Sequence, residues 1–117
     1  MKVHEVWVVD DDESIRWVLK KAFLKSSIKV KLFSDGREAL RLADEFEPEV
    51  IISDIRMPDI NGLDLLRQIK KIHPSLPIII MTAYADLDKA VESFSSGAFE
   101  YLPKPFDIEE MLKVVKR

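Results

Sequence analysis

Apolar runs and amphipathic stretches alternate five times along the chain. A short apolar run between helical patterns is typical of a strand that helices cover on both faces. The pattern therefore predicts a parallel sheet with helices on both sides. The predicted strands are residues 5–10, 29–33, 50–53, 78–82 and 99–102, and the predicted helices are residues 13–25, 36–45, 63–72, 87–96 and 108–116.

Each predicted helix carries one apolar stripe that is expected to lie on the sheet. In the first helix the stripe comprises Ile15, Val18, Leu19 and Phe23 at helical spacing. A second stripe, on residues 87–96, comprises Leu87, Ala90, Val91 and Phe94. Gly97 follows that helical pattern at the place where a residue with a left-handed backbone belongs.

Right-handed crossovers and helices on both faces leave a doubly wound α/β sheet as the predicted topology. Its commonest five-stranded order is 2-1-3-4-5, the flavodoxin-like arrangement. A length of 117 residues suits a single domain with one sheet and is too short for two domains. Since the sequence ends in a helical pattern, we expect this domain to be a part of a longer protein.

Composition excludes several classes of protein. The chain has 47% hydrophobic and 33% charged residues, which is a globular balance, and its net charge of −3 disfavours non-specific binding to nucleic acid. It contains no cysteine, no apolar run near the roughly 20 residues of a membrane span, and no signal-peptide pattern at its start. A cytoplasmic location without membrane contact is therefore expected.

Carboxylates gather at the ends of two predicted strands. Asp10, Asp11 and Asp12 close the first apolar run, and Asp54 closes the third. In the predicted order these two strands are neighbours, so Asp10 and Asp11 should face Asp54 where such sheets bind ligands. Like charges about 4 Å apart repel by roughly 4 kcal/mol at an effective dielectric near 20, so the cluster should hold a cation or a proton.

The surrounding residues favour magnesium and a phosphoryl group. Thr82 and Lys104 end or follow the fourth and fifth strands and should lie at the same edge as the acids. Magnesium takes oxygen ligands, usually one or two carboxylates with phosphate oxygens. A carboxylate such as that of Asp54 can form an aspartyl phosphate when a metal and a cation neutralise the phosphoryl oxygens.

Three further observations limit which residues and ligands belong to the site. His4 and His73 precede the first and fourth strands, so they are expected at the opposite edge, on the surface, and zinc chemistry is disfavoured. Asp12 is placed to cap the first helix, as an isolated Asp at a strand end most often does. The three glycines form no G-x-G-x-x-G or Walker pattern, so nucleotide binding has no support.

Four separated blocks of the sequence resemble the receiver domain of bacterial two-component response regulators, over essentially the whole chain. They are residues 8–11 (VVDD), 53–58 (SDIRMP), 81–83 (MTA) and 101–106 (YLPKPF). Longer blocks look like the nitrogen regulatory protein C (NtrC) subfamily. These are residues 6–12 (VWVVDDD), 14–19 (SIRWVL), 53–58 and 97–108.

The resemblance implies a role for each matching residue. Asp54 would be the phosphoacceptor, with Asp10, Asp11 and the backbone carbonyl of Arg56 completing a Mg²⁺ site around it. Lys104 would pair with the phosphoryl group, and Thr82 would hydrogen-bond to it. Thr82 and Tyr101 would form the switch pair, and the helix at residues 87–96 would shift to expose part of its stripe.

The resemblance also implies partners and an output. An NtrB-like histidine kinase would donate the phosphoryl group, and the domain would slowly hydrolyse its own aspartyl phosphate without being a metabolic enzyme. ATPase and DNA-binding domains of a sigma-54-dependent transcription activator would follow this domain in the full-length protein. Whether phosphorylation makes a homodimer is left open.

Two other functions compete with this one. Residues 10–14 (DDDES) loosely match the D-x-D start of haloacid-dehalogenase-like phosphatases, in which Asp10 would be the nucleophile and Asp54 incidental. However, the chain has no room for a cap domain, and it has no matching acidic pair later in the sequence. The third hypothesis is a receiver-like interaction module that never carries phosphate. The presence of Asp54, Lys104 and the acid pair argues against it.

Overall fold

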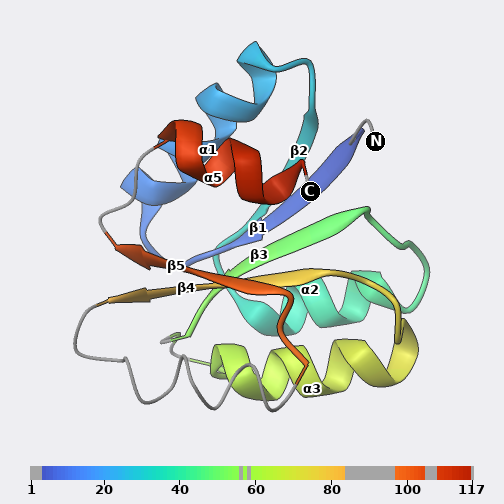
Figure 1. The fold of residues 1–117 in the computed structure, drawn as a ribbon. Coiled ribbons are helices and arrows are strands. Elements are labelled where there is room, and N and C mark those ends of the chain that lie inside the picture. The colour runs from blue at the N-terminus through green and yellow to red at the C-terminus, as the bar shows by residue number, and fades with distance from the viewer. Residues whose placement is uncertain (1–3, 56, 58, 84–96, 105–107, 117) are drawn as a thin grey trace.

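Five parallel strands form one sheet in the order β2-β1-β3-β4-β5, which confirms the predicted doubly wound topology (Figure 1). The computed structural model describes residues 4–55, 57, 59–83, 97–104 and 108–116. The strands are β1 (Glu5–Val9), β2 (Lys29–Phe33), β3 (Val50–Asp54), β4 (Ile78–Ala83) and β5 (Glu100–Lys104).

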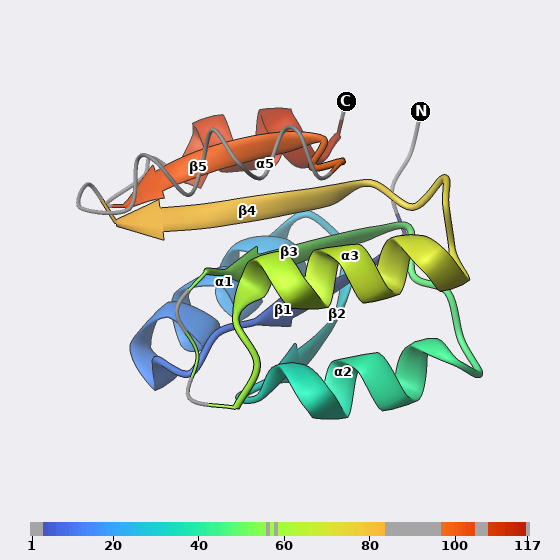
Figure 2. The same cartoon turned by 90° about the horizontal axis from the view of Figure 1, so that it is seen from below.

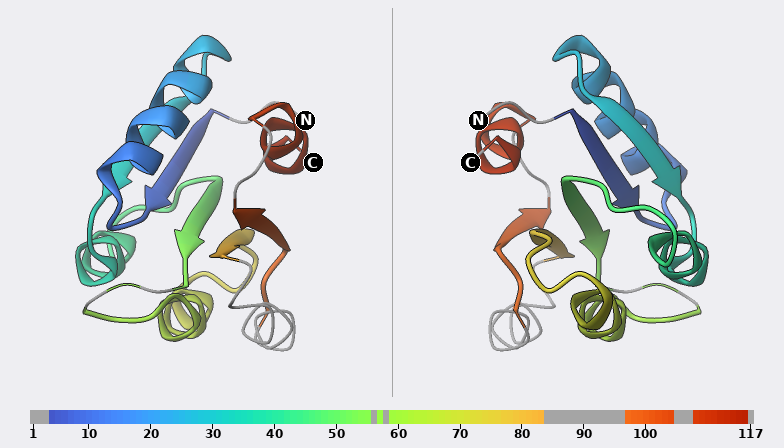
Figure 3. Two further views of the ribbon diagram at one scale, coloured as in Figure 1. Left: turned by 90° about the vertical axis from the view of Figure 1, so that its left-hand side faces the viewer. Right: turned by 90° about the vertical axis from the view of Figure 1, so that its right-hand side faces the viewer.

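Helices cover both faces of the sheet, as predicted. Helices α1 (Glu13–Lys25) and α5 (Ile108–Val115) lie on one face, and α2 (Gly36–Ala43) and α3 (Gly62–Ile72) lie on the other (Figures 1 and 3). The predicted helix at residues 87–96 and its stripe lie outside the described residues. Within the described ranges, no helix has the length and apolar character that a membrane span needs.

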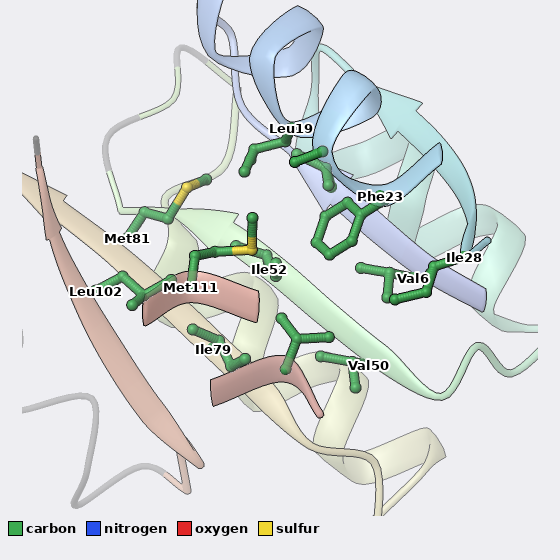
Figure 4. Packing of buried hydrophobic residues seen from close by; sticks show 13 residues of the cluster. Val6, Leu19, Phe23, Ile28, Val50, Ile52, Ile79, Met81, Leu102 and Met111 are labelled. Atoms are coloured by element: carbon green, nitrogen blue, oxygen red, sulfur yellow. The ribbon is translucent and has the colours of Figure 1, made fainter. Parts of the chain in front are cut away.

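The strands bury both faces, because successive side chains point to opposite sides of a sheet. On β1, Val6 and Val8 pack under α1 and α5, whereas Trp7 and Val9 pack against α2 and α3. Figure 4 shows the first of these two cores, in which Phe23 packs among side chains from the sheet. Two separate cores therefore hold the sheet in place.

The predicted stripe of α1 is right for most of its members and wrong for one. Leu19 and Phe23 are fully buried and Ile15 packs against the same core, but Val18 is 42% exposed. At about 100° per residue Val18 lies at the margin of the stripe, and Ala22 takes its place in the core. Gly97 has the expected positive φ, at +106°.

Several strand ends differ from the prediction by one or two residues. Strand β3 extends through Asp54, and β5 runs from Glu100 to Lys104, so Lys104 lies within the strand. Strand β1 ends at Val9, one residue early, yet the Asp10 N–H still donates to the Phe33 carbonyl at 3.0 Å. Helix α2 ends at Ala43, two residues early.

The loop from β3 to α3 is attached to the first turn of α2. Figure 2 shows the described part of this loop passing close to the start of α2. The Asp59 carboxylate accepts hydrogen bonds from the N–H of Arg37 at 2.9 Å and of Gly36 at 3.4 Å. Partial burial raises the pKa of Asp59, but backbone N–H donors, those of Arg37 and Ile60 above all, outweigh it and lower the pKa from 3.8 to about 2. A negative charge at this helix N-terminus therefore stabilises the loop.

Replacing Asp59 with Asn should remove a pH-dependent part of the stability. Because the folded pKa is lowered, the contribution is present above pH 3.8 and is lost as the pH falls toward 2. After discounting for solvent screening it is roughly 1 kcal/mol. Urea unfolding of parent and Asp59→Asn should show a difference at pH 5 that shrinks steadily toward pH 3. A difference that stays constant over this range would contradict the assignment.

Candidate functional site

Three carboxylates meet at the carboxyl end of the central strands. One oxygen from each of Asp10, Asp11 and Asp54 lies within 4.8 Å of the other two. The side chain of Asp10 is fully buried, that of Asp54 is half-buried and that of Asp11 is exposed. The pairing of Val9 with Ser53 places the next residues of β1 and β3, Asp10 and Asp54, side by side. The cluster lies where the topology predicts a ligand site.

Hydrogen bonds within residues 10–16 hold Asp10 in place. Its Oδ1 accepts from the Asp12 N–H at 2.9 Å, and its backbone carbonyl accepts from Arg16 Nη1 at 2.7 Å. The Asp12 carboxylate accepts from the Ser14 N–H at 2.8 Å, so Asp12 is the N-cap of α1, as predicted. The buried Asp10 carboxylate is thereby tied to the start of α1.

Asp54 is fixed by the residues on either side of it and by α3. Its Oδ1 accepts from the Ile55 N–H at 2.8 Å, and its carbonyl accepts from Ser53 Oγ at 2.9 Å. The Gly62 N–H donates to the Ile55 carbonyl at 2.7 Å. A Cβ on Gly62 would overlap the Asp54 carbonyl oxygen and approach Ile55 Cα to 2.9 Å, so only glycine allows α3 to begin this close to Asp54.

The donor set fits a small hard cation. All three groups offer carboxylate oxygens, the ligands that magnesium prefers, and they supply no sulfur or imidazole. One side of the cluster is open, because Asp11 is exposed and Asp54 is half-exposed. Room for water or for phosphate oxygens suits magnesium, which usually keeps several non-protein ligands.

The backbones of the predicted phosphoryl-binding residues reach the same edge. Thr82 pairs with Pro103, and Ala83 pairs with Lys104, at the carboxyl ends of β4 and β5. Asp54 pairs with Met81, so Thr82 is one position beyond the residue opposite Asp54. Contact of the Thr82 hydroxyl and the Lys104 ammonium with a phosphoryl group stays a prediction.

The remaining predicted site residues are Arg56 and Tyr101. Arg56 lies outside the described residues. Tyr101 pairs with Ile80, is half-buried and packs against the core under α2 and α3. A half-buried ring next to a core is compatible with the predicted switch role, which no contact here tests.

Both histidines lie far from the acids, at the opposite edge of the sheet. His4 is exposed and precedes β1, as expected. The expectation of a surface role is only partly right for His73, because its side chain is 18% exposed and contacts two groups. Its Nε2 lies 2.8 Å from the Ala43 carbonyl and its Nδ1 lies 3.2 Å from Glu47 Oε1.

A cleft of about 420 Å³ also lies at the opposite edge, between the starts of β3 and β4 and the end of α5. Its walls are mostly apolar and include Val50, Pro77, Phe99 and Val115. Of the two carboxylates that line it, Glu49 accepts from the N–H groups of His4 and Glu5, and Glu47 pairs with His73. The acid edge therefore remains the candidate site.

Three supporting residues were missed by sequence reasoning. Arg16 holds the Asp10 carbonyl, Gly62 permits the close approach of α3, and Asp59 fastens the loop to α2. The Asn61-Gly62 pair indicates a turn, but it does not indicate that Gly62 packs against the Asp54 backbone. Arg16 and Asp59 gave no signal, because each binds a backbone group outside its own turn: Arg16 that of Asp10, six residues away, and Asp59 that of Arg37, 22 residues away.

Comparison with known proteins identifies relatives along the whole chain. Residues 6–116 match the family described as response regulator receiver domain. The DNA-binding transcriptional regulator NtrC of Escherichia coli K12 is 54% identical over 112 residues, which cover 96% of this chain and 24% of that protein. NtrC of Proteus hauseri is 50% identical over 117 residues, covering 100% of this chain and 25% of that protein.

The fold is also that of a solved structure. The apo receiver domain of nitrogen regulatory protein C, in solution, matches with a TM-score of 0.89 and 53% identity, covering 100% of this chain and 94% of that chain. The present chain spans about a quarter of the length of the curated relatives it matches.

Substitution of Asp12 should affect stability, whereas substitution of Asp11 should affect Mg²⁺ binding. Asp12→Ala removes the cap of α1 and should lower the free energy of unfolding by about 1 kcal/mol while leaving Mg²⁺ binding unchanged. Asp11→Ala should weaken Mg²⁺ binding at least about tenfold with little change in stability, because Asp11 is exposed. Urea unfolding and Mg²⁺ titration followed by NMR measure both. Weakened Mg²⁺ binding in Asp12→Ala would show that Asp12 belongs to the cluster.

Gly62→Ala should destabilise the domain by roughly 2 kcal/mol, because the added methyl meets the Asp54 backbone, which cannot move without disturbing β3. Gly36→Ala is the matched control at the first residue of α2. Its methyl would meet the Ile60 side chain, which can shift, so the cost should be smaller. Urea unfolding of both variants measures the difference, and the reverse order would contradict this account of Gly62.

Proposed function

The chain belongs to the response regulator receiver domain family, and we propose that it accepts a phosphoryl group on Asp54 and signals through the resulting change in conformation. The observation that carries the proposal is the meeting of Asp10, Asp11 and Asp54 within 4.8 Å at the switch point of a doubly wound sheet. Receiver domains bind Mg²⁺ at such a cluster, and the family match covers every residue of it.

The phosphoryl transfer uses the Asp54 carboxylate as nucleophile. One carboxylate oxygen forms a bond to phosphorus while the bond from phosphorus to the donor nitrogen of a phosphohistidine breaks. The Ile55 N–H, at 2.8 Å from Oδ1, fixes the rotation of the carboxylate, so the attack starts from an oriented group. Later attack of water on phosphorus returns the free carboxylate and releases inorganic phosphate.

The other residues supply charge. Bound Mg²⁺ would be held by Asp10, Asp11, Asp54 and the Arg56 carbonyl, and it would neutralise the negative charge of the phosphoryl oxygens. The Lys104 ammonium would pair with another of these oxygens, and the Thr82 hydroxyl would donate to the phosphoryl group. Both residues extend from the strands beyond β3, so new interactions would form on the β4 and β5 side of Asp54.

These new interactions provide the switch. Phosphorylation adds close to two negative charges, and it shifts an equilibrium between two conformations only if it binds one of them more tightly. Movement of Thr82 toward the phosphoryl group would vacate space into which the ring of Tyr101 turns. The domain thus acts as a signalling switch with slow self-dephosphorylation.

The partners follow from the relatives. We place the chain in a two-component system of the nitrogen-regulation type, with an NtrB-like histidine kinase as donor. A sigma-54-dependent transcription activator with ATPase and DNA-binding domains would be the full-length protein, and this domain would be its N-terminal part. A cysteine-free sequence favours a reducing cytoplasm as its location.

The phosphatase alternative conflicts with the environment of Asp10. A nucleophile must reach its substrate, but the Asp10 side chain is fully buried and its Oδ1 accepts from the Asp12 N–H. Asp54, at the end of β3, is half-exposed.

Mass spectrometry after treatment with acetyl phosphate and Mg²⁺ tests the proposal. We expect one phosphoryl group, dependent on Mg²⁺ and mapped to Asp54, in the parent and none in Asp54→Asn. Asp10→Asn should take up phosphoryl much more slowly because the cation site is incomplete. An adduct on Asp10 that persists in Asp54→Asn would indicate the phosphatase-like site, and no adduct under any condition would indicate an interaction module.

A further inference from the structure

The charged side chain of Asp59 attaches the loop between β3 and α3 to α2. The Asp59 carboxylate accepts from the N–H groups of Gly36 and Arg37, which are 23 and 22 positions earlier in the sequence. Loop side chains pack at the same place, since a Cβ on Gly36 would overlap Ile60 Cγ2 and lie 3.3 Å from Met57 Cε. The start of α2 is therefore the surface on which this loop is supported.

The same loop leads directly to Asp54. Asp59 lies three residues before Gly62, whose backbone is in close contact with the Asp54 carbonyl and donates to the Ile55 carbonyl. The N–H of Ile55 in turn orients the Asp54 carboxylate. A displacement of the loop at Asp59 would move the start of α3. Gly62 and Ile55, which set the direction of the Asp54 carboxylate, would move with it.

We infer that Asp59 is a positioning residue for the phosphoacceptor site, holding the entry of α3 against α2 so that the Asp54 carboxylate keeps the geometry a cation needs. This inference rests on the proposed function. Magnesium demands near-ideal octahedral geometry, and residues that orient its ligands typically change metal affinity 10- to 100-fold. Asp59 itself contacts neither the metal nor the phosphoryl group.

Helix α2 offers a matched control for this role. Asp35 caps the same helix from within, since its Oδ1 accepts from the Glu38 N–H at 3.0 Å. Removal of either carboxylate takes hydrogen bonds from the first turn of α2. The Asp35 side chain also interacts with the Asp59 carboxyl and helps to lower its pKa, but the Asp59 carboxylate is the group that holds the loop against α2. The two variants therefore separate positioning from helix stability.

The test compares Asp59→Ala, Asp59→Asn and Asp35→Ala with the parent. Mg²⁺ affinity is measured without phosphorylation, by NMR titration of the amide signals of Asp10, Asp11 and Ile55. Uptake from acetyl phosphate is measured at limiting Mg²⁺, and urea unfolding establishes that each variant is folded. We expect roughly tenfold weaker Mg²⁺ binding in Asp59→Ala, a smaller loss in Asp59→Asn, which keeps one acceptor oxygen, and parental affinity in Asp35→Ala.

The outcomes separate this inference from the proposed function. If the parent binds Mg²⁺ and becomes phosphorylated on Asp54 but all variants match it, the positioning role is wrong and the proposed function stands. Equal losses in Asp59→Ala and Asp35→Ala would also overturn the positioning role, because the effect would then arise from α2 alone. A parent that neither binds Mg²⁺ nor accepts phosphoryl would overturn both.

Discussion

Mutual repulsion of carboxylates at one edge of the sheet is the constraint on which the remaining arrangement depends. With oxygens no more than 4.8 Å apart, two charged carboxylates such as Asp10 and Asp54 would repel by at least roughly 3 kcal/mol at an effective dielectric near 20. Side chains on flexible loops would move apart. Here the backbone prevents this, because both residues continue adjacent hydrogen-bonded strands and both carboxylates accept from backbone N–H groups nearby. The folding energy of the sheet thus maintains a site that attracts a cation.

Much of this edge was predictable because it depends on strand order. Apolar runs locate β1 and β3, the crossover rule makes them neighbours, and their last residues must then meet. The supporting contacts were not predictable, because each joins a residue to a backbone group of a different segment, which no local sequence pattern identifies. Asp59 bonds to Arg37 across 22 residues, and nothing local distinguishes it from a solvated loop aspartate. Val18 shows a similar limit, since helical spacing alone does not fix the margin of a buried stripe.

The opposite edge of the sheet is built for stability. Glu49 accepts from the N–H groups of His4 and Glu5 and so joins the start of β1 to the segment before β3. Beyond it, the Lys70 ammonium donates to the Leu76 carbonyl at 2.6 Å, and His73 links the end of α3 to the end of α2. These polar contacts fix chain segments to one another at the end of the sheet opposite the acid cluster. If the domain changes conformation at the carboxyl ends of its strands, these contacts can keep the opposite end of the sheet unchanged.

At the end of the sheet that carries the acid cluster, the residues that follow β1 are already held by hydrogen bonds before any ligand binds. Asp10 is tied to Asp12 and Arg16, and Asp12 is tied to the first turn of α1, so hydrogen bonds already hold these groups in place. A ligand changes conformation only through interactions that differ between two states. Thr82 and Lys104 lie on the other side of Asp54, where their backbones pair with Pro103 and Ala83 near the carboxyl ends of β4 and β5. An edge that is held by hydrogen bonds next to β1 would direct the effect of the proposed phosphorylation toward β4 and β5.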